Sequence, residues 1–334
     1  MQNLVARAVL FVAATVLAVL SGSVHPGSML AQSDTVPTNC QVGIYLRSLH
    51  SFDPNADTFG GDLWLWSVCP SDEDQPLHTM EFVNADDTAI LLDVPGNPFW
   101  ANRNVDGTFR YDWDERDFPF DRHTLTIELE EGVDDVRKFI YEPDLANSGV
   151  DPTLELPGGW QITGWSLTGG SNVYPTTFGD PELSSGGSSE YSRLTLSVDL
   201  ARNDLSGFFK MTAVVYAAFI FSLVTYLMQM DASSGIGPRV SLLAIALFSA
   251  AVNLINASNA LGTSSGLTLV DWIHIIVLIY ILIAAAVTVI SRLLLDRGWS
   301  VADVTQLNYR LGAVAVISFV AINISLVRQA LALG

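Results

Sequence analysis

Four long apolar stretches in the C-terminal part of this chain limit what it can fold into. Met211–Met230, Val240–Leu261 and Leu311–Val327 contain no charged residue, and Leu267–Ile290 contains one. A helix of about 20 apolar residues can cross the roughly 30 Å hydrocarbon core of a bilayer. The sequence therefore predicts an all-α four-helix transmembrane domain over 206–334, with helices at about 207–230, 239–261, 267–292 and 308–331.

The first 31 residues predict a secretory signal peptide. Arg7 precedes a short apolar run, Ala8–Leu20, and small residues follow from Ser21 onward. Short apolar runs with these flanks are typical of cleaved signals rather than membrane spans. We expect the mature chain to begin near Gln32; an uncleaved anchor is the alternative.

The intervening segment, 32–205, has the pattern of a β-sandwich. Apolar residues alternate with polar ones at 124–129 and 194–200, and Gly, Pro, Asn and Asp separate such runs. A period of two with one apolar face indicates antiparallel sheets packed face to face. We therefore expect an extracellular sandwich of about ten antiparallel strands.

The negative charge of the chain belongs to this sandwich segment. Gln32–Leu205 holds 31 acidic and 9 basic residues, whereas the rest of the chain beyond it holds 4 and 6. Such a field attracts cations and disfavours nucleic acid, so no nucleic-acid partner is expected. A surface adapted to high salt is an equally good explanation.

Two cysteines, Cys40 and Cys69, lie at the ends of two strand-like runs around a turn at Asp53–Asn55. Antiparallel pairing about that turn places opposite each other residues whose numbers add to about 109, as these two do. A cross-strand disulfide formed in an oxidising compartment follows. Two buried thiols are the alternative.

Basic residues favour one orientation in the membrane. A cleaved signal places the sandwich outside the cell, so the loops 231–238 and 292–310 face the cytoplasm. The outer loop 262–266 has no basic residue, whereas the ends of the inner loops carry Arg239, Arg292, Arg297 and Arg310. This bias agrees with the positive-inside rule.

Several short motifs resemble the pentameric ligand-gated ion channels, or Cys-loop receptors, in their prokaryotic form. Phe118-Pro119-Phe120-Asp121 is similar to the loop at the base of that family's sandwich, and Arg202 to the arginine before its first membrane helix. Tyr111 and Leu125 stand where the two cysteines of that loop would be. Further similar segments are Pro76…Phe82-Val83-Asn84-Ala85, Trp160–Trp165, Arg239-Val240-Ser241-Leu242 and Val270–Ile273.

The resemblance implies a homopentamer of identical subunits in a prokaryotic inner membrane, with the N-terminal domain periplasmic. A small-molecule agonist, which the sequence does not identify, would open a path for inorganic ions. Two departures stand out: the first membrane helix lacks the proline usual in the family, and Gly235–Pro238 lacks the acidic residue of cation-selective members. Charge selectivity is therefore not carried over.

The register of the second membrane helix has two interpretations. The resemblance places a pore-facing stripe at Ser241, Ile245, Phe248, Val252 and Asn259, with Asn256 as a further candidate. Apolar rings in such a stripe stop ions by dewetting. Polarity alone favours a face with Ser249, Asn253 and Asn256, which serve equally well as hydrogen bonds between helices.

The resemblance also assigns residues that couple the sandwich to the pore: Asp53, Phe118, Pro119, Phe120, Asp121 and Arg202. Asp121 and Arg202 are expected to form a partly buried charge pair. The turn at Asp53–Asp57 and the Phe118–Phe120 loop would press on the linker 262–268. A turn-capping role is the alternative for Asp121.

Family geometry places the agonist between subunits, under the loop 178–191. One side would contribute Phe82, Phe178, Tyr191 and the Gly132–Arg137 loop, and the other Trp64, Trp66, Trp100 and Arg103. Aromatic cages suit amines through cation–π attraction. Trp64 and Trp66 lie on one face of their strand, so both could instead belong to the sandwich core.

No cofactor is expected, although Ca²⁺ is a candidate modulator because carboxylates supply the hard oxygen ligands it prefers. His274, near the outer end of a membrane helix, is either a proton switch or a hydrogen-bonded packing residue. The two acidic clusters are Asp112, Asp114, Glu115 and Asp117, and Glu130, Glu131, Asp134 and Asp135.

Two other classes of protein compete with a channel. A nonconducting four-helix membrane sensor would need a cytoplasmic effector, but the inner loops span only about 8 and 19 residues. For an exported membrane enzyme we find no zinc-ligand spacing, nucleophile elbow or phosphate loop in the sequence. The chain is therefore not expected to be an enzyme, and no catalytic residue is assigned.

Overall fold

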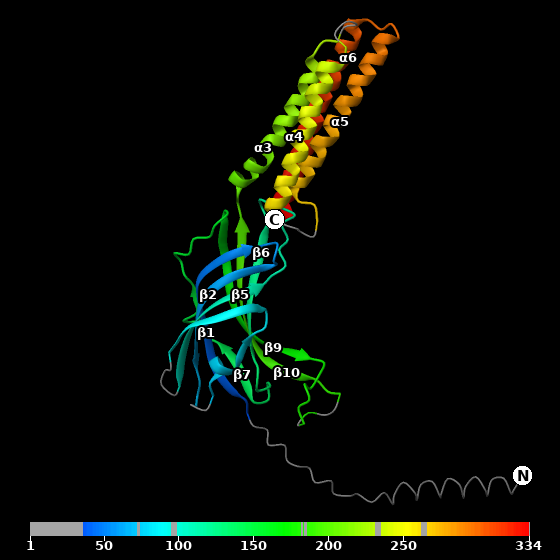
Figure 1. Cartoon of the computed structure of the whole chain (residues 1–334). Coiled ribbons are helices and arrows are strands. Elements are labelled where there is room, and N and C mark those ends of the chain that lie inside the picture. The colour runs from blue at the N-terminus through cyan, green and yellow to red at the C-terminus, as the bar shows by residue number, and fades with distance from the viewer. Residues whose placement is uncertain are drawn as a thin grey trace, which may run out of the picture. The chain divides into compact units, whose positions relative to one another are not determined.

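The computed structural model describes residues 36–71, 74–94, 99–181, 183, 186–230, 235–261 and 266–333. The expected signal peptide, 1–31, lies outside the described residues, as do parts of the loops 178–191, 231–238 and 262–268. Strands occupy the first part of the described chain and four long helices the last part (Figure 1).

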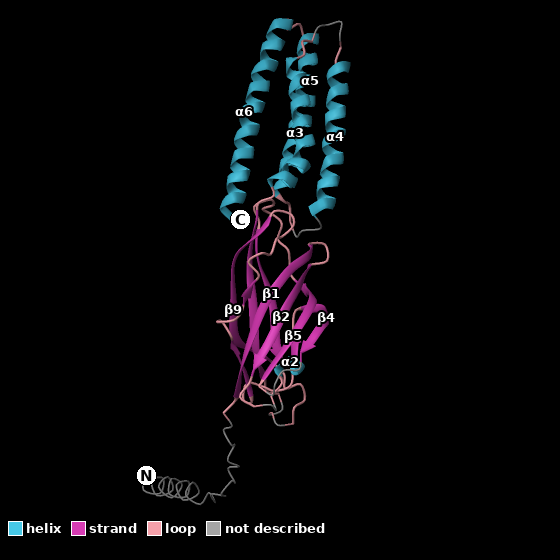
Figure 2. Cartoon of the chain, turned by 90° about the vertical axis from the view of Figure 1, so that its left-hand side faces the viewer, coloured by secondary structure: helices cyan, strands magenta, loops and turns pink. Residues whose placement is uncertain are grey.

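Two sheets make up the N-terminal domain (Figure 2). Together they contain ten strands among the described residues, close to the number expected. The first sheet has the order β4 (Ala85–Val94), β5 (Trp100–Arg110), β2 (Thr58–Val68), β1 (Thr38–Asp53) and β7 (Phe139–Pro143), with β8 (Gly149–Val150) also paired to β1. The second has the order β3 (Met80–Phe82), β6 (Arg122–Glu131), β10 (Ser189–Arg202) and β9 (Trp160–Tyr174), and a short helix, α2 (Pro76–Thr79), precedes β3.

Two strand pairs differ from the antiparallel arrangement that the sequence predicts. β7 and β8 both run parallel to β1, whereas the other pairs are antiparallel. The difference has a topological cause. The chain crosses to the second sheet for β6 and returns to the first sheet, so β7 arrives beside β1 in the same direction rather than through a hairpin.

The predicted alternation places apolar side chains in one core between the sheets. Leu125, Ile127 and Leu129 of β6 are at most 2% exposed, and they pair with Val198, Leu196 and Leu194 of β10. The first sheet contributes residues such as Val42 and Leu63 to the same core. The period-two pattern thus predicts this face of the sheet correctly.

The cysteines are joined by the disulfide that strand register suggests. Gln41 lies opposite Val68 in the β1–β2 pair, and the register stays constant as far as Leu46 and Leu63. Cys40 and Cys69 therefore stand at the open end of the hairpin, where they form the bond.

Four helices follow, and each is long and apolar enough to span a membrane. They are α3 (Leu205–Leu227), α4 (Gly237–Leu261), α5 (Leu269–Asp296) and α6 (Val301–Leu333). Their facing sides pack into a second core, separate from that of the sandwich.

Two helices begin at residues other than those predicted, and in both cases capping residues explain the difference. α6 begins at Val301 rather than at 308, because the Ser300 hydroxyl accepts a hydrogen bond from the Asp303 amide at 3.1 Å and donates to its carboxylate at 2.7 Å. α5 begins at Leu269 after a capping box of Thr268 and Asp271. Asp271 therefore has a local structural role, as capping carboxylates often do.

We predict that replacing both cysteines, Cys40→Ser and Cys69→Ser, lowers the Tm of the sandwich by roughly 5–15 °C. The bond closes a loop with a sequence separation of 29, and such links stabilise folded proteins by about 2–4 kcal/mol. Thermal melts of the purified protein measure the shift. Adding a reductant should lower the Tm of the wild type toward that of the variant and leave the variant unchanged; an equal response in both would contradict the assignment.

Candidate functional site

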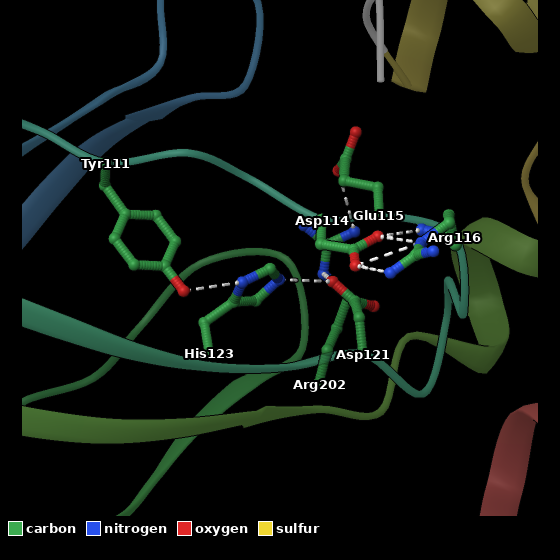
Figure 3. A network of polar contacts seen from close by, with 7 residues as sticks. All are labelled: Tyr111, Asp114, Glu115, Arg116, Asp121, His123 and Arg202. Atoms are coloured by element: carbon green, nitrogen blue, oxygen red, sulfur yellow. Dashed lines mark hydrogen bonds and ion pairs between the residues drawn. The ribbon is translucent and has the colours of Figure 1, made fainter. Parts of the chain in front are cut away.

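Arg202 ends strand β10, three residues before α3 begins, and its guanidinium lies between two buried carboxylates (Figure 3). Nη1 is 3.4 Å from Oε1 of Glu115, and Nε is 3.6 Å from Oδ2 of Asp121. The backbone repeats this connection, because the Arg202 amide donates to the Asp121 carbonyl at 2.9 Å. The expected pair of Asp121 and Arg202 is thus present as one half of a three-residue cluster.

Two aromatic rings hold the same guanidinium from its faces. Its central carbon lies 4.2 Å from the ring centre of Trp160 and 5.0 Å from that of Phe118. Both rings are almost fully buried, so water does not compete for the cation–π contact. Arg202 is therefore fixed by charge and by stacking at the same time.

A hydrogen-bonded chain extends from Asp121 into the sandwich. Asp121 Oδ2 lies 3.2 Å from Nε2 of His123, and Nδ1 of His123 lies 3.1 Å from the Tyr111 hydroxyl (Figure 3). The ring of Trp113 packs edge-on against both Tyr111 and His123. Asp121 is thus a buried member of a network, not a turn cap.

Burial dominates the electrostatics of this cluster. It raises the pKa of Glu115 to about 7; Arg202 acts in the opposite sense, and Asp121 raises the value further. Burial also raises the pKa of Asp117, whereas hydrogen bonds from Arg116 hold the pKa of Asp114 below its ordinary value. Two buried oxygens, Glu115 Oε2 and Asp121 Oδ1, have no hydrogen-bond partner among the described residues.

The base of the sandwich contacts the helices through this segment. The Leu269 amide at the start of α5 donates to the Arg116 carbonyl at 2.9 Å, and Phe118 packs into the core formed by the helices. A cavity of about 560 Å³ lies beside this contact, lined among others by Asp117, Asp121 and Trp272. The loop that contains Glu115 and Asp121 therefore contacts the helices directly, through Arg116 at the first turn of α5 and through Phe118.

The other expected coupling residues have plainer roles. The Asp53 carboxylate accepts hydrogen bonds from the amides of Asn55 and Ala56, at 2.9 and 3.2 Å, and so shapes its own turn. The Phe118–Pro119 peptide bond is cis. Phe120 is half-buried against the helix core. The linker 262–268 is described only from Gly266 onward.

Helix α4 presents one face to its own bundle and another outward. Leu243, Ala246, Ala250 and Ala257 are buried against the other helices. The stripe that the resemblance selects lies outward: Ile245, Phe248 and Val252 are 61%, 72% and 40% exposed, and Ser241, Asn256 and Asn259 are also exposed. The other helices of the same chain therefore leave this stripe uncovered.

One residue of the polar alternative, Asn253, is engaged inside the bundle. Asn253 donates through its side-chain amide to the Met211 carbonyl of α3, and this amide nitrogen also lies 2.7 Å from Nε2 of His274 on α5. His274 is buried, with Nδ1 2.7 Å from the Val270 carbonyl. Asn253 and His274 thus connect three helices, as the packing interpretation of both residues requires.

The expected ligand residues form one cluster and several separate contacts. Phe178 and Tyr191 lie 6.3 Å apart, and Tyr174, which the sequence analysis missed, lies 5.3 and 6.1 Å from them. The Tyr174 hydroxyl donates to Glu130 at 2.7 Å. Phe82 instead packs on Phe109 and the sandwich core.

The residues proposed for the opposite side of the ligand site lie on the outer face of the first sheet or near its edge. Trp64 and Trp66 point away from the core, which leaves the core role to Leu63 and Leu65. Trp66 donates to Asp144 at 2.9 Å. Trp100 is exposed, and Arg103 is paired with Asp93 at 3.2 Å. These residues are not brought together with the Tyr174 cluster inside one chain.

The acidic clusters do not form a metal site: in the described part of the chain, no group of three or more His, Cys, Asp or Glu side chains is arranged to hold a metal ion. Their carboxylates have protein partners instead. Asp114 pairs with Arg116, Asp135 with Arg137 and Asp134 with Lys138. Glu130 pairs with Arg193, and Glu131 accepts from Thr79 and Tyr141. The expectation of Ca²⁺ ligands is therefore unsupported.

Sequence reasoning missed His123, and it considered Glu115 only as a candidate Ca²⁺ ligand rather than as a partner of Arg202. Glu115 sits in an acidic run, Asp112 to Asp117, that looks uniformly exposed. One signal was available. Trp113 and Glu115 are two residues apart, so in an extended segment their side chains point to the same side, and a buried Trp113 would place Glu115 on the side of the core as well.

No protein-family model matches this chain, and no curated protein matches it.

We predict that Arg202→Met destabilises the protein by about 3–5 kcal/mol, because it leaves two buried carboxylates without their shared cation. Denaturant unfolding followed by tryptophan fluorescence measures the loss. Adding Glu115→Gln and Asp121→Asn should restore much of the stability, since it removes the stranded charges. A triple variant no more stable than Arg202→Met would show that neutralising these carboxylates is not the role of Arg202.

Proposed function

We propose that this protein is a homopentameric ligand-gated ion channel of a prokaryotic inner membrane, with its sandwich on the periplasmic side. The observation that carries the proposal is the outward stripe of α4. Five copies of an apolar stripe with polar ends, Ser241 at one and Asn259 at the other, would enclose a water-filled path with a hydrophobic constriction. The motifs in Phe118–Asp121 and Arg239–Leu242 support the same proposal.

A membrane-facing role for that stripe is a weaker explanation. A helix that faces lipid gains nothing from Ser241, Asn256 and Asn259 on the same side as Ile245 and Phe248. In a pore the polar residues would meet water at the two mouths, and Phe248 would lie near the middle of the helix. Its ring is the most exposed of the three apolar side chains, so it forms the proposed gate.

Coupling would run through Arg202. The guanidinium ties the loop that contains Asp121 to the last residue of β10, and α3 begins three residues later. The same loop contacts the start of α5 through Arg116 and Leu269. A ligand that prefers one arrangement of the sandwich would thereby bias the helices, which is how ligands shift a two-state equilibrium.

The stripe can be tested by cysteine accessibility, because both native cysteines are in the disulfide and provide no reactive background. Phe248→Cys and Val252→Cys should make the current of the reconstituted protein sensitive to a charged, membrane-impermeant thiol reagent. Ala246→Cys and Ala250→Cys are the matched controls, because their positions are fully buried in the bundle. We expect block in the first pair and no change in the second.

Three results would count against the proposal. Equal block in both pairs would place the pore on another face of α4. No current from a correctly sized pentamer, in wild type and in Phe248→Ala, would favour a nonconducting sensor. A monomer on sizing would exclude a pore of this design.

The agonist that fits best is an organic amine. Tyr174, Phe178 and Tyr191 offer three ring faces within about 6 Å of one another, and Phe178 is largely exposed. The surplus of carboxylates in the sandwich would draw a cation toward them.

We predict that a quaternary ammonium probe such as tetramethylammonium binds at this cluster and that Tyr191→Ala weakens binding about 5- to 30-fold, as expected from a loss of 1–2 kcal/mol of cation–π energy. Tyr191→Phe keeps the ring face and should bind nearly as the wild type does. Titration calorimetry measures both. Equal weakening in the two variants would point to the hydroxyl and against an aromatic cage.

A further inference from the structure

The buried cluster at the base of the sandwich contains one acid more than its cation can neutralise. Glu115 and Asp121 are both at most 3% exposed at their side chains, and Arg202 is the one cation that contacts them among the described residues. With both carboxylates ionised and His123 neutral, the cluster would carry a net negative charge out of contact with water. Uncompensated buried charge is costly, and the usual remedy is to bind a proton.

The hydrogen bonds indicate which group takes that proton. Both ring nitrogens of His123 have partners: Nε2 lies 3.2 Å from Asp121 Oδ2, and Nδ1 lies 3.1 Å from the Tyr111 hydroxyl. Asp121 Oδ2 has a hydrogen bond with His123 at 3.2 Å and lies 3.6 Å from Arg202 Nε, which is a charge contact rather than a hydrogen bond. Among the described residues, Glu115 has a single side-chain hydrogen bond, from Arg202 Nη1 to Oε1 at 3.4 Å, and its Oε2 has no hydrogen-bond partner. Glu115 therefore has one long hydrogen bond in a buried position, and its second oxygen, without a partner in the described part of the chain, is where a proton can bind.

The surrounding groups support this assignment. Arg202 favours the ionised form of Glu115, and Asp121 opposes it. Asp117 and the Asp114–Arg116 pair lie in the same segment, nearer to solvent. The carboxylates at the neighbouring helix starts, Asp204 and Asp271, cap their own helices.

We propose that Glu115, Asp121, His123 and Arg202 form a proton-binding site in which Glu115 holds the exchangeable proton, and that loss of this proton redistributes Arg202 between its two carboxylates. The consequence for ion flow rests on the proposed channel function, whereas proton binding itself does not.

The direction of the effect follows from linkage. The present arrangement binds the proton more tightly than a hydrated glutamate does, so low pH favours it and it is progressively disfavoured as the pH rises through about 7. An arrangement that exposes Glu115 to water increases in population over the same pH range. The shift from 4.5 to about 7 changes the ratio of the two arrangements by on the order of a hundredfold per subunit.

The test is an infrared pH titration of the full-length protein in liposomes, with and without ¹³C-labelled glutamate. In the wild type we expect a protonated-carboxyl band that disappears near pH 7 and moves to lower frequency with the label. Glu115→Gln, a nearly isosteric change, should remove this band. Asp117→Asn, a neutralisation two residues away, should retain it. Tryptophan fluorescence, which reports on Trp113 and Trp160 beside the cluster, should lose its response near pH 7 only in Glu115→Gln.

The outcomes separate this inference from the proposed channel. A band unaffected by the label, or retained in Glu115→Gln, would overturn the assignment to Glu115 even if the protein conducts. A glutamate band that Glu115→Gln abolishes would support the site even if no current is found. Should Glu115→Gln fail to fold, the labelled wild type still decides whether a glutamate titrates near pH 7. Where current is measured, its pH response should also vanish in Glu115→Gln, and a retained response would contradict the link to gating.

Discussion

The position of one guanidinium constrains the end of the sandwich that adjoins the helices. Arg202 lies between two carboxylates and against two aromatic rings that replace water, and Glu115, Asp121, Phe118 and Trp160 supply them from two separate segments. Because Arg202 is the last residue of β10, these segments can move only together with the chain that enters α3. A buried ion cluster is a weak source of net stability, but it specifies one arrangement sharply, since any mismatch leaves a charge unpaired.

The same principle holds between the helices, where polar side chains and one cation, Arg239, meet neutral partners. Asn253 and His274 are joined inside the bundle, and Arg239 donates to the Met228 carbonyl at the end of α3 and faces the side-chain amide of Asn308 on α6. Polar groups within a membrane domain must find partners, so these contacts fix which side of α4 faces inward. The outward side is then defined by exclusion. This explains why Asn253, which polarity alone places on a water-facing side, is used in contacts between helices instead.

Sequence reasoning succeeded where a residue's neighbours along the chain determine its environment. Alternation identified the core faces of β6 and β10, and strand pairing about one turn brought Cys40 to Cys69. It failed where the partner is remote. The parallel placement of β7 depends on a crossover between sheets, and Glu115 differs from its acidic neighbours only because Arg202, 87 residues away, lies on its side of the chain. The early start of α6 at Ser300 and Asp303 was readable locally and was overlooked.

The inward contacts of α4 also limit how that helix can move if it lines a pore. Rotation about its axis would break the Asn253 hydrogen bonds, each worth about 0.6–1.7 kcal/mol, and would turn the buried Arg239 toward lipid or a neighbouring subunit. Exposing that cation costs several kcal/mol, far more than the hydrogen bonds. A tilt that pivots near Arg239 keeps the contacts of that residue but displaces Asn253 together with the end near Asn259. Tilting therefore costs only the Asn253 hydrogen bonds, whereas rotation costs those and the burial of Arg239. Tilting is the less costly motion, and it would widen the pore from the sandwich side inward.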